Sequence, residues 1–167
     1  MSLFPWFLFV HILGAIIAFG ASFSAFPLLG AMSGKEPAHA NFGSRVSVAV
    51  SEKVVRPMAI LQGLTGLGLI WTASIDLTKA LWLDVAIVLY LIALGYALFV
   101  QIPVGRRLVE LTSGGPPPVP AGGAGAPPAS MGPPPELIAA ATKARQGGIL
   151  LVVMITIIVF LMVVKPF

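Results

Sequence analysis

The chain has 167 residues, of which 57% are hydrophobic and only 10% are charged, and its mean hydropathy is +0.99. Soluble domains are about one-quarter charged, so this composition excludes a soluble globular domain and predicts a polytopic membrane protein. The net charge of +4 does not indicate nucleic-acid binding, because no basic cluster is interleaved with aromatic residues. There is no cysteine, which excludes disulfides, iron–sulfur clusters and thiolate metal sites.

The first apolar segment, residues 3–32, contains no charged residue and includes His11. At about 1.5 Å per residue, a helix of this length exceeds the roughly 30 Å hydrocarbon core of a bilayer. On a helical wheel, His11 shares one face with small residues, namely Gly14, Ala15, Ala18, Ser22 and Ala25. Stripes of small residues are typical of positions where membrane helices approach closely, so His11 is expected to face the interior of a bundle.

His11 has two interpretations, and both stay open. An ionisable side chain inside a membrane is a functional-site hypothesis, and neutral imidazole is a ligand for haem iron, chlorin magnesium, copper or zinc. In the alternative, the imidazole performs no chemistry and forms a hydrogen bond to a carbonyl of a neighbouring helix, to Gln62 or to Tyr96.

Three more apolar segments follow, at residues 54–75, 80–103 and 147–164. The sequence therefore predicts an all-α fold, a four-transmembrane-helix bundle that forms a single membrane domain over residues 1–167. Of the ten basic residues, eight flank the first and third connections, and only Lys79 and Lys165 lie on the other side. By the positive-inside rule, both termini are expected on the outer, periplasmic side, with the two long connections in the cytoplasm.

The two long connections differ in character. In residues 33–53, apolar side chains recur at every fourth position from Phe42, which predicts an amphipathic cytoplasmic helix before the second span. It either lies at the membrane interface or extends the second span, and Pro57 would kink or restart the helix there. Residues 114–135 hold nine prolines and six glycines without any charge, which is typical of an extended cytoplasmic linker.

The second span carries the pattern QGLTGLGL at residues 62–69, whose Gln62, Gly63 and Gly66 form another small and polar patch. This patch suits packing against the small face of the first segment. The candidate cofactor site therefore has His11 as an axial ligand and four residues as pocket lining, namely Gly14, Ala18, Gln62 and Gly66. No catalytic residue and no cluster of metal ligands is singled out, since His39 is expected across the membrane from His11.

Four landmarks support a resemblance to known families. They are FVHILGAIIAFG in the first span, Arg56-Pro57 followed by LTGLGL, LWL at residues 81–83, and the closing MVVKPF. Together they resemble a bacterial family of small four-helix integral membrane proteins related to the copper-resistance D-type membrane domain. More distantly, they resemble the membrane protoporphyrinogen oxidase family, which binds haem b through a histidine of its first helix. The resemblance implies a location in the bacterial inner membrane, and it makes His11 the candidate haem ligand.

The resemblance is incomplete in the third span. A lysine that the oxidase-like proteins carry after the tryptophan is replaced here by an apolar run around Ala86. This departure removes support for protoporphyrinogen oxidation and leaves the binding of haem b or another tetrapyrrole open.

Two functions follow from these observations. In the first, the protein is a non-catalytic accessory subunit of a larger, energy-transducing membrane complex, with other membrane subunits or a second copy as partners. In the second, it is a tetrapyrrole-binding redox protein that uses His11. The first is favoured, because one histidine and one interfacial carboxylate, Asp84, are few ionisable groups for an enzyme. A low-spin haem would also need a second axial ligand.

Overall fold

The computed structural model describes residues 2–32, 37–113 and 133–166, and every regular element within these ranges is a helix. In chain order they are α1 (Phe4–Met32), α2 (Pro37–Val50), the π-helical turn η1 (Ser51–Val55), α3 (Arg56–Thr72), the 3₁₀ turn η2 (Leu77–Lys79), α4 (Leu81–Tyr96), the π-helical turn η3 (Ala97–Gln101), α5 (Ile102–Ser113) and α6 (Pro135–Val164). Four helical stretches are long and apolar enough to cross a membrane. The predicted all-α fold with four spans is therefore confirmed.

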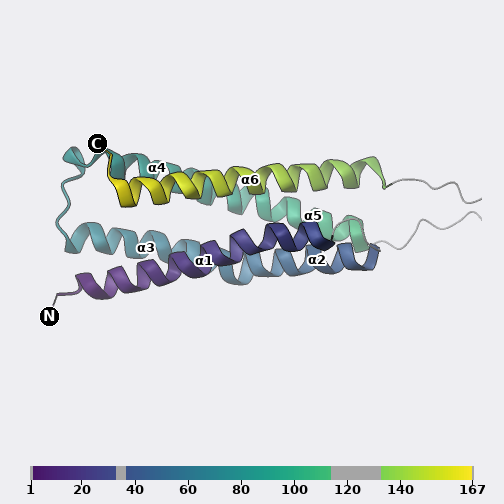
Figure 1. Cartoon of the computed structure of the whole chain (residues 1–167), viewed down its shortest axis with the longest axis horizontal. Helices are drawn as coiled ribbons and strands as arrows, with labels where there is room; N and C mark the ends of the chain where they lie inside the picture. The colour runs from purple at the N-terminus through teal and green to yellow at the C-terminus, as the bar shows by residue number, and fades with distance from the viewer. Residues whose placement is uncertain (1, 33–36, 114–132, 167) are drawn as a thin grey trace, which may run out of the picture.

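The helices form two antiparallel pairs that meet at one end of the molecule (Figure 1). α1 packs along α3, and α4 packs along α6, whereas α3 and α4 make few direct contacts. At that end, α2 packs against α5 and joins the two pairs. The N- and C-termini lie at the opposite end, the N-terminus on the side of the α1–α3 pair and the C-terminus on the side of the α4–α6 pair (Figure 1).

The two central spans are longer than the sequence predicts. α2, η1 and α3 run on without a break, and their stretch His39–Thr72 alone has 34 residues, about 51 Å at the α-helical rise. α4, η3 and α5 likewise form one stretch of 33 residues, Leu81–Ser113. The fourth helix starts at Pro135, well before the expected apolar core at residue 147. Amphipathic turns therefore continue these helices beyond the roughly 30 Å that a bilayer core requires.

This continuity decides between the two readings of residues 33–53. The amphipathic helix α2 does not lie apart from the second span but extends it through η1. The connection from 114 to 132 falls outside the described residues, and the last residue of the expected linker, Pro135, is the first residue of α6.

Each of the two long central helices contains a proline that is accommodated by a π-helical turn. The N–H of Arg56 bonds to the carbonyl of Ser51, and the N–H of Ile102 bonds to that of Ala97, five residues back in both cases. Pro57 and Pro103 follow immediately. Since a proline ring has no N–H and crowds the preceding turn, a widened turn at this point allows the helix to continue. Pro57 therefore does not restart the helix.

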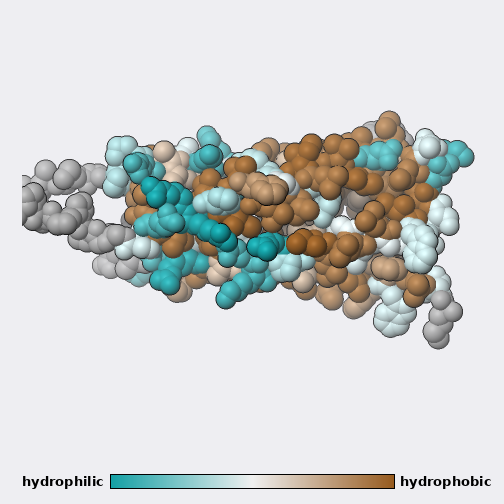
Figure 2. Space-filling view, turned by 180° about the vertical axis from the view of Figure 1, so that it is seen from behind, coloured by the Kyte–Doolittle hydropathy of each residue, from teal (hydrophilic) through white to brown (hydrophobic). Residues whose placement is uncertain are grey.

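Burial inside the bundle is small, as expected for helices that face lipid. The buried apolar residues are few and several are alanines: Ala18, Ala80, Leu83, Ala86, Ala93, Ile102, Met154 and Leu161. Large apolar side chains point outward instead, for example Leu67, Trp71 and Phe99, which are 63%, 72% and 80% exposed. Apolar residues cover the half of the molecule that bears the termini, and hydrophilic residues gather on the other half (Figure 2). In lipid such an apolar surface has no cost, because acyl chains are as apolar as the side chains.

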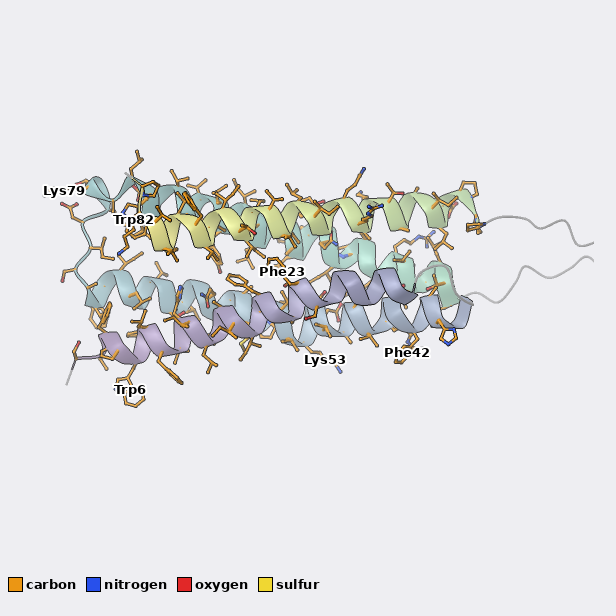
Figure 3. The ribbon with its side chains drawn as sticks, in the orientation of Figure 1. Trp6, Phe23, Phe42, Lys53, Lys79 and Trp82 are labelled. Carbon is orange, nitrogen blue, oxygen red and sulfur yellow. The ribbon has the colours of Figure 1, made fainter. Side chains whose placement is uncertain are left out.

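Aromatic and charged residues mark the end with the termini. Trp6 is 67% exposed and points away from the bundle (Figure 3). The ammonium group of Lys165 lies 5.3 Å from the ring centre of Trp82, a cation–π distance. In the turn before α4, the Thr78 hydroxyl and the Lys79 ammonium contact the Asp76 carboxylate at 2.6 and 3.2 Å and hold its pKa below the usual range, with a further contribution from the Thr78 N–H.

Candidate functional site

The first candidate site lies where α1 crosses α3. Phe7 packs over Gly68, His11 over Gly66, and Gly14 faces Gln62, as expected for antiparallel helices. A Cβ atom at Gly68 would overlap the Phe7 ring, so this glycine is needed for the close approach. The small residues thus let the two helices approach closely enough for the polar side chains to meet.

His11 is held by a chain of hydrogen bonds to α3. Its Nδ1 atom lies 2.9 Å from the hydroxyl of Thr65, and that hydroxyl lies 2.8 Å from the carbonyl of Leu61. The carbonyl can only accept, so the single hydroxyl proton is donated to it, and the hydroxyl oxygen accepts a proton from His11. This network assigns the proton of the imidazole to Nδ1.

The other ring nitrogen is left free. Among the described residues, Nε2 of His11 has no hydrogen-bond partner, and the side chain is only half-buried. In a neutral imidazole protonated at Nδ1, Nε2 carries the lone pair, which is the form that binds a metal. The site therefore presents one oriented nitrogen ligand.

Gln62 adds an unsatisfied acceptor beside this ligand. Its Oε1 atom is buried and has no hydrogen-bond partner in the described part of the chain. It lies against Gly14, where a Cβ atom would be 3.0 Å away. Leaving a buried acceptor unpaired costs about 1–3 kcal/mol, so this amide is suited to accept a bond from a polar group that enters the site.

A second polar cluster lies in the other helix pair. The amide of Gln101 donates to the carbonyl of Ala144 at 2.9 Å, and its Oε1 is also buried without a partner among the described residues. Gly147 provides the space for this amide and for the hydroxyl of Tyr96. Tyr96 therefore packs within the α4–α6 pair and does not bond to His11. Thr65 forms the hydrogen bond to His11 instead.

One tyrosine connects the two pairs. The Tyr90 hydroxyl of α4 donates to the carbonyl of Ala59 on α3 at 2.8 Å and lies against Gly63. Because α3 and α4 make few other direct contacts, this bond is a main link between the pairs in the half with the termini.

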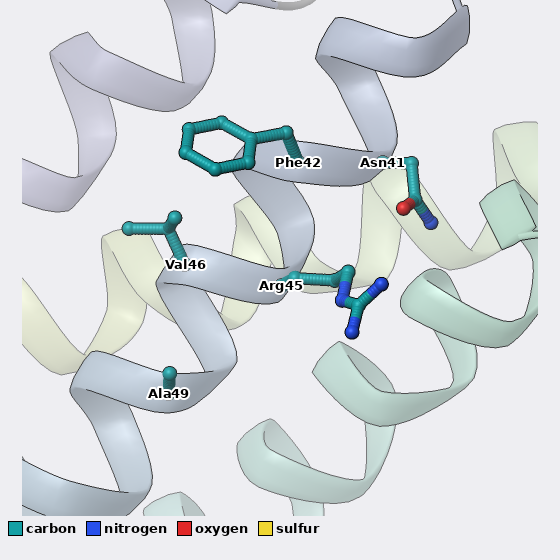
Figure 4. A pocket seen from close by; sticks show the side chains of 5 residues that line it. All are labelled: Asn41, Phe42, Arg45, Val46 and Ala49. Carbon is teal, nitrogen blue, oxygen red and sulfur yellow. The ribbon is translucent and has the colours of Figure 1, made fainter.

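A shallow groove lies away from His11, on the part of α2 beyond the apolar band. It is lined by Asn41, Phe42, Arg45, Val46 and Ala49 (Figure 4). The Asn41 amide points towards α5 and donates to the side chains of Thr112 and Ser113 at 3.0 Å. Phe42 is 60% exposed. No group of three or more His, Cys, Asp or Glu side chains that could hold a metal ion occurs in the described ranges.

The five residues that the sequence singles out come together. His11, Gly14 and Ala18 lie along the inner side of α1, and Gln62 and Gly66 of α3 contact the first two of them. Sequence reasoning missed Thr65, which is 5% exposed and supplies the bond to His11. A signal was present, because Thr65 follows Gln62 by three positions and therefore shares its helix face.

A bundle of four long apolar helices with outward-facing large side chains defines the class of protein, a multi-pass integral membrane protein. The family model of the predicted integral membrane proteins DUF2269 matches residues 6–114, and the chain belongs to that family. The match spans most of α1 and all of α2 to α5, and so includes both His11 and Thr65. No curated protein and no solved structure shows significant similarity to the chain.

Proposed function

We propose that the protein binds a metal tetrapyrrole, such as haem b, with His11 Nε2 as an axial ligand. One observation carries the proposal, namely the hydrogen bond from Nδ1 of His11 to Thr65, which orients the ring and leaves Nε2 free. Second-shell partners of this kind are the rule for metal-binding histidines. The bound group would supply redox or light-absorbing chemistry.

The chain's own residues fit such a group in two further respects. The unpaired Oε1 of Gln62 offers an acceptor on the same helix face as Thr65. The scarcity of contacts between α3 and α4 means that little packing would be lost if the helix pairs moved apart to admit a macrocycle. The resemblance of the first span to the haem-binding oxidase family supports the same assignment, and the resemblance to the copper-resistance D-type domain supports an inner-membrane location.

The direct test is an absorption spectrum of the protein purified in mild detergent after expression with a haem precursor. We expect a Soret band in the wild type that is lost in His11→Ala and kept in His39→Ala, a matched control because His39 is the other histidine and lies exposed on α2. Thr65→Val should weaken binding by about 10–100-fold. A colourless wild type, or a band that survives in His11→Ala, would refute the proposal.

A second function, that of an accessory subunit in a larger membrane complex, is favoured by a separate observation. Phe42 lies 60% exposed in the groove of α2, on the hydrophilic half of the molecule. An exposed aromatic ring in a groove outside the apolar band is typical of a surface for a partner. The partner would be another membrane subunit or a second copy of the chain.

This second function is tested by placing a photo-crosslinking amino acid at position 42 in cells, with position 138 of α6 as control. Ile138 has a similar exposure, 53%. We expect one discrete adduct from position 42 and none from position 138. Adducts of equal yield from both positions, or none from either, would contradict a docking role for the groove.

The orientation of the chain in the membrane is also part of the proposed function. Since seven of the nine basic residues in the described ranges lie away from the end with the termini, all except Lys79 and Lys165, the positive-inside rule puts both termini in the periplasm. If tags attached to the two termini are accessible from the cytoplasm, this assignment is reversed.

A further inference from the structure

The basic side chains of the hydrophilic half fall into two groups. The first group is neutralised, since Arg106 pairs with Glu52 at 2.5 Å and Arg107 pairs with Glu110 and Glu136 at 3.1 and 3.4 Å. Within the described ranges, these three glutamates are all the acidic residues of that half. The second group consists of exposed side chains that form no salt bridge within the described ranges: Arg45, Lys53, Arg56, Lys143 and Arg145.

Two members of the second group lie on one helix face. Lys53 and Arg56 are three positions apart around the junction of η1 and α3, and side chains at this spacing are neighbours. Glu52 points to α5, where it meets Arg106, whereas Lys53 points away from the bundle (Figure 3). The acidic neighbour in the sequence therefore does not neutralise this face.

The same face continues as an apolar strip through the membrane. Ile60, Leu64, Leu67 and Trp71 follow at helical spacing and are 44%, 61%, 63% and 72% exposed. Trp71 marks one interface. Arg56 and Lys53 lie 15 and 18 positions before it, about 22 and 27 Å along the helix. In a bilayer core of roughly 30 Å, with long side chains that snorkel, their charges reach the phosphate level of the opposite leaflet.

We propose that Lys53 and Arg56 bind the phosphate of an anionic phospholipid whose acyl chain lies along Ile60 and Leu64. A guanidinium group can donate hydrogen bonds to two phosphate oxygens at once, and an ammonium group on a flexible side chain adds a point charge. The strip above these cations offers an acyl chain a continuous apolar contact. Both parts of one lipid molecule are thus matched on a single exposed helix face.

The proposal is tested with the full chain in phosphatidylcholine nanodiscs that contain a small fraction of spin-labelled phosphatidylglycerol or spin-labelled phosphatidylcholine. The measured quantity is the association constant of each labelled lipid with the protein. We expect the wild type to prefer phosphatidylglycerol. Each of Lys53→Gln and Arg56→Gln should lower this preference by about five-fold, from the energy of one basic residue near an anionic surface, while Lys53→Arg with Arg56→Lys should keep most of it.

The matched control is the double substitution Lys143→Gln with Arg145→Gln, which removes the same charge from α6. A site at Lys53 and Arg56 requires this control to retain the preference. An equal loss in this control and in the double substitution Lys53→Gln with Arg56→Gln would overturn the proposal in favour of a diffuse effect of net charge. Displacement of the labelled lipid by millimolar glycerol phosphate would overturn it as well, because the site would then select a soluble phosphate.

Discussion

Replacing Thr65 with valine should weaken the contact between α1 and α3 by removing the acceptor of His11 Nδ1. Valine keeps nearly the same shape, so the packing of this 5%-exposed position is retained. Hydrogen bonds between membrane helices contribute about 0.6 kcal/mol on average and up to about 1.7 kcal/mol. The bond here is 2.9 Å long and its acceptor is buried, so we expect a loss near the upper end of that range.

The chain provides a matched control on the same helix. The Thr72 hydroxyl donates to the Gly68 carbonyl at 2.7 Å, just as Thr65 donates to Leu61. Thr72 has no bond to another helix among those described. Thr72→Val should therefore change the free energy of unfolding by less than about 0.5 kcal/mol.

The assay is equilibrium unfolding in mixed detergent micelles, followed by circular dichroism for both single variants and for a double-mutant cycle with His11→Ala. The cycle should give a coupling energy of about 0.6–1.7 kcal/mol between His11 and Thr65. Equal effects of Thr65→Val and Thr72→Val, together with a coupling energy near zero, would refute the assignment of this hydrogen bond.

Two further predictions concern other parts of the bundle. Gly147→Ala should lower the thermal unfolding temperature, because the added Cβ atom would overlap the Gln101 amide, and overpacking costs about 1–3 kcal/mol. Gly95→Ala is the control and should not lower it, because a Cβ atom at Gly95 would have no other atom within 4 Å. The backbone amides of the turn at Asp76 should be protected from hydrogen exchange above about pH 4, because the Thr78 hydroxyl binds the charged form of the carboxylate. This protection should be lost as the pH falls through the lowered pKa of Asp76. This explanation would be excluded if the exchange rates, corrected for intrinsic rates, do not depend on pH. It would also be excluded if the Asp76→Asn variant shows the same pH dependence as the wild type.

Much of the fold could be predicted because the bilayer imposes strong constraints on composition. Four apolar segments with at most one charged residue each were enough to locate the spans. The α-helical period was enough to place His11 and Gly14 on one face. The small patch at Gln62 and Gly66 also pairs with this face as expected. The role of Thr65 was missed, because a threonine in an apolar helix often bonds only its own backbone, and its distance to His11 depends on the register of two helices.

The length of the two central helices could not be read from the sequence for a different reason. Pro57 predicts a kink or a restart of the helix, yet the π-helical turns before Pro57 and Pro103 keep α2 continuous with α3 and α4 continuous with α5. Both central helices therefore extend beyond the apolar band. There α2 contacts α5 through the bonds from Asn41 to Thr112 and Ser113, and η1 contacts α5 through the bond between Glu52 and Arg106. In the apolar half, the α1–α3 and α4–α6 pairs are free to carry separate polar clusters. His11 consequently lies in the half where the bundle is least tightly joined, which is where a ligand could enter with the smallest loss of packing.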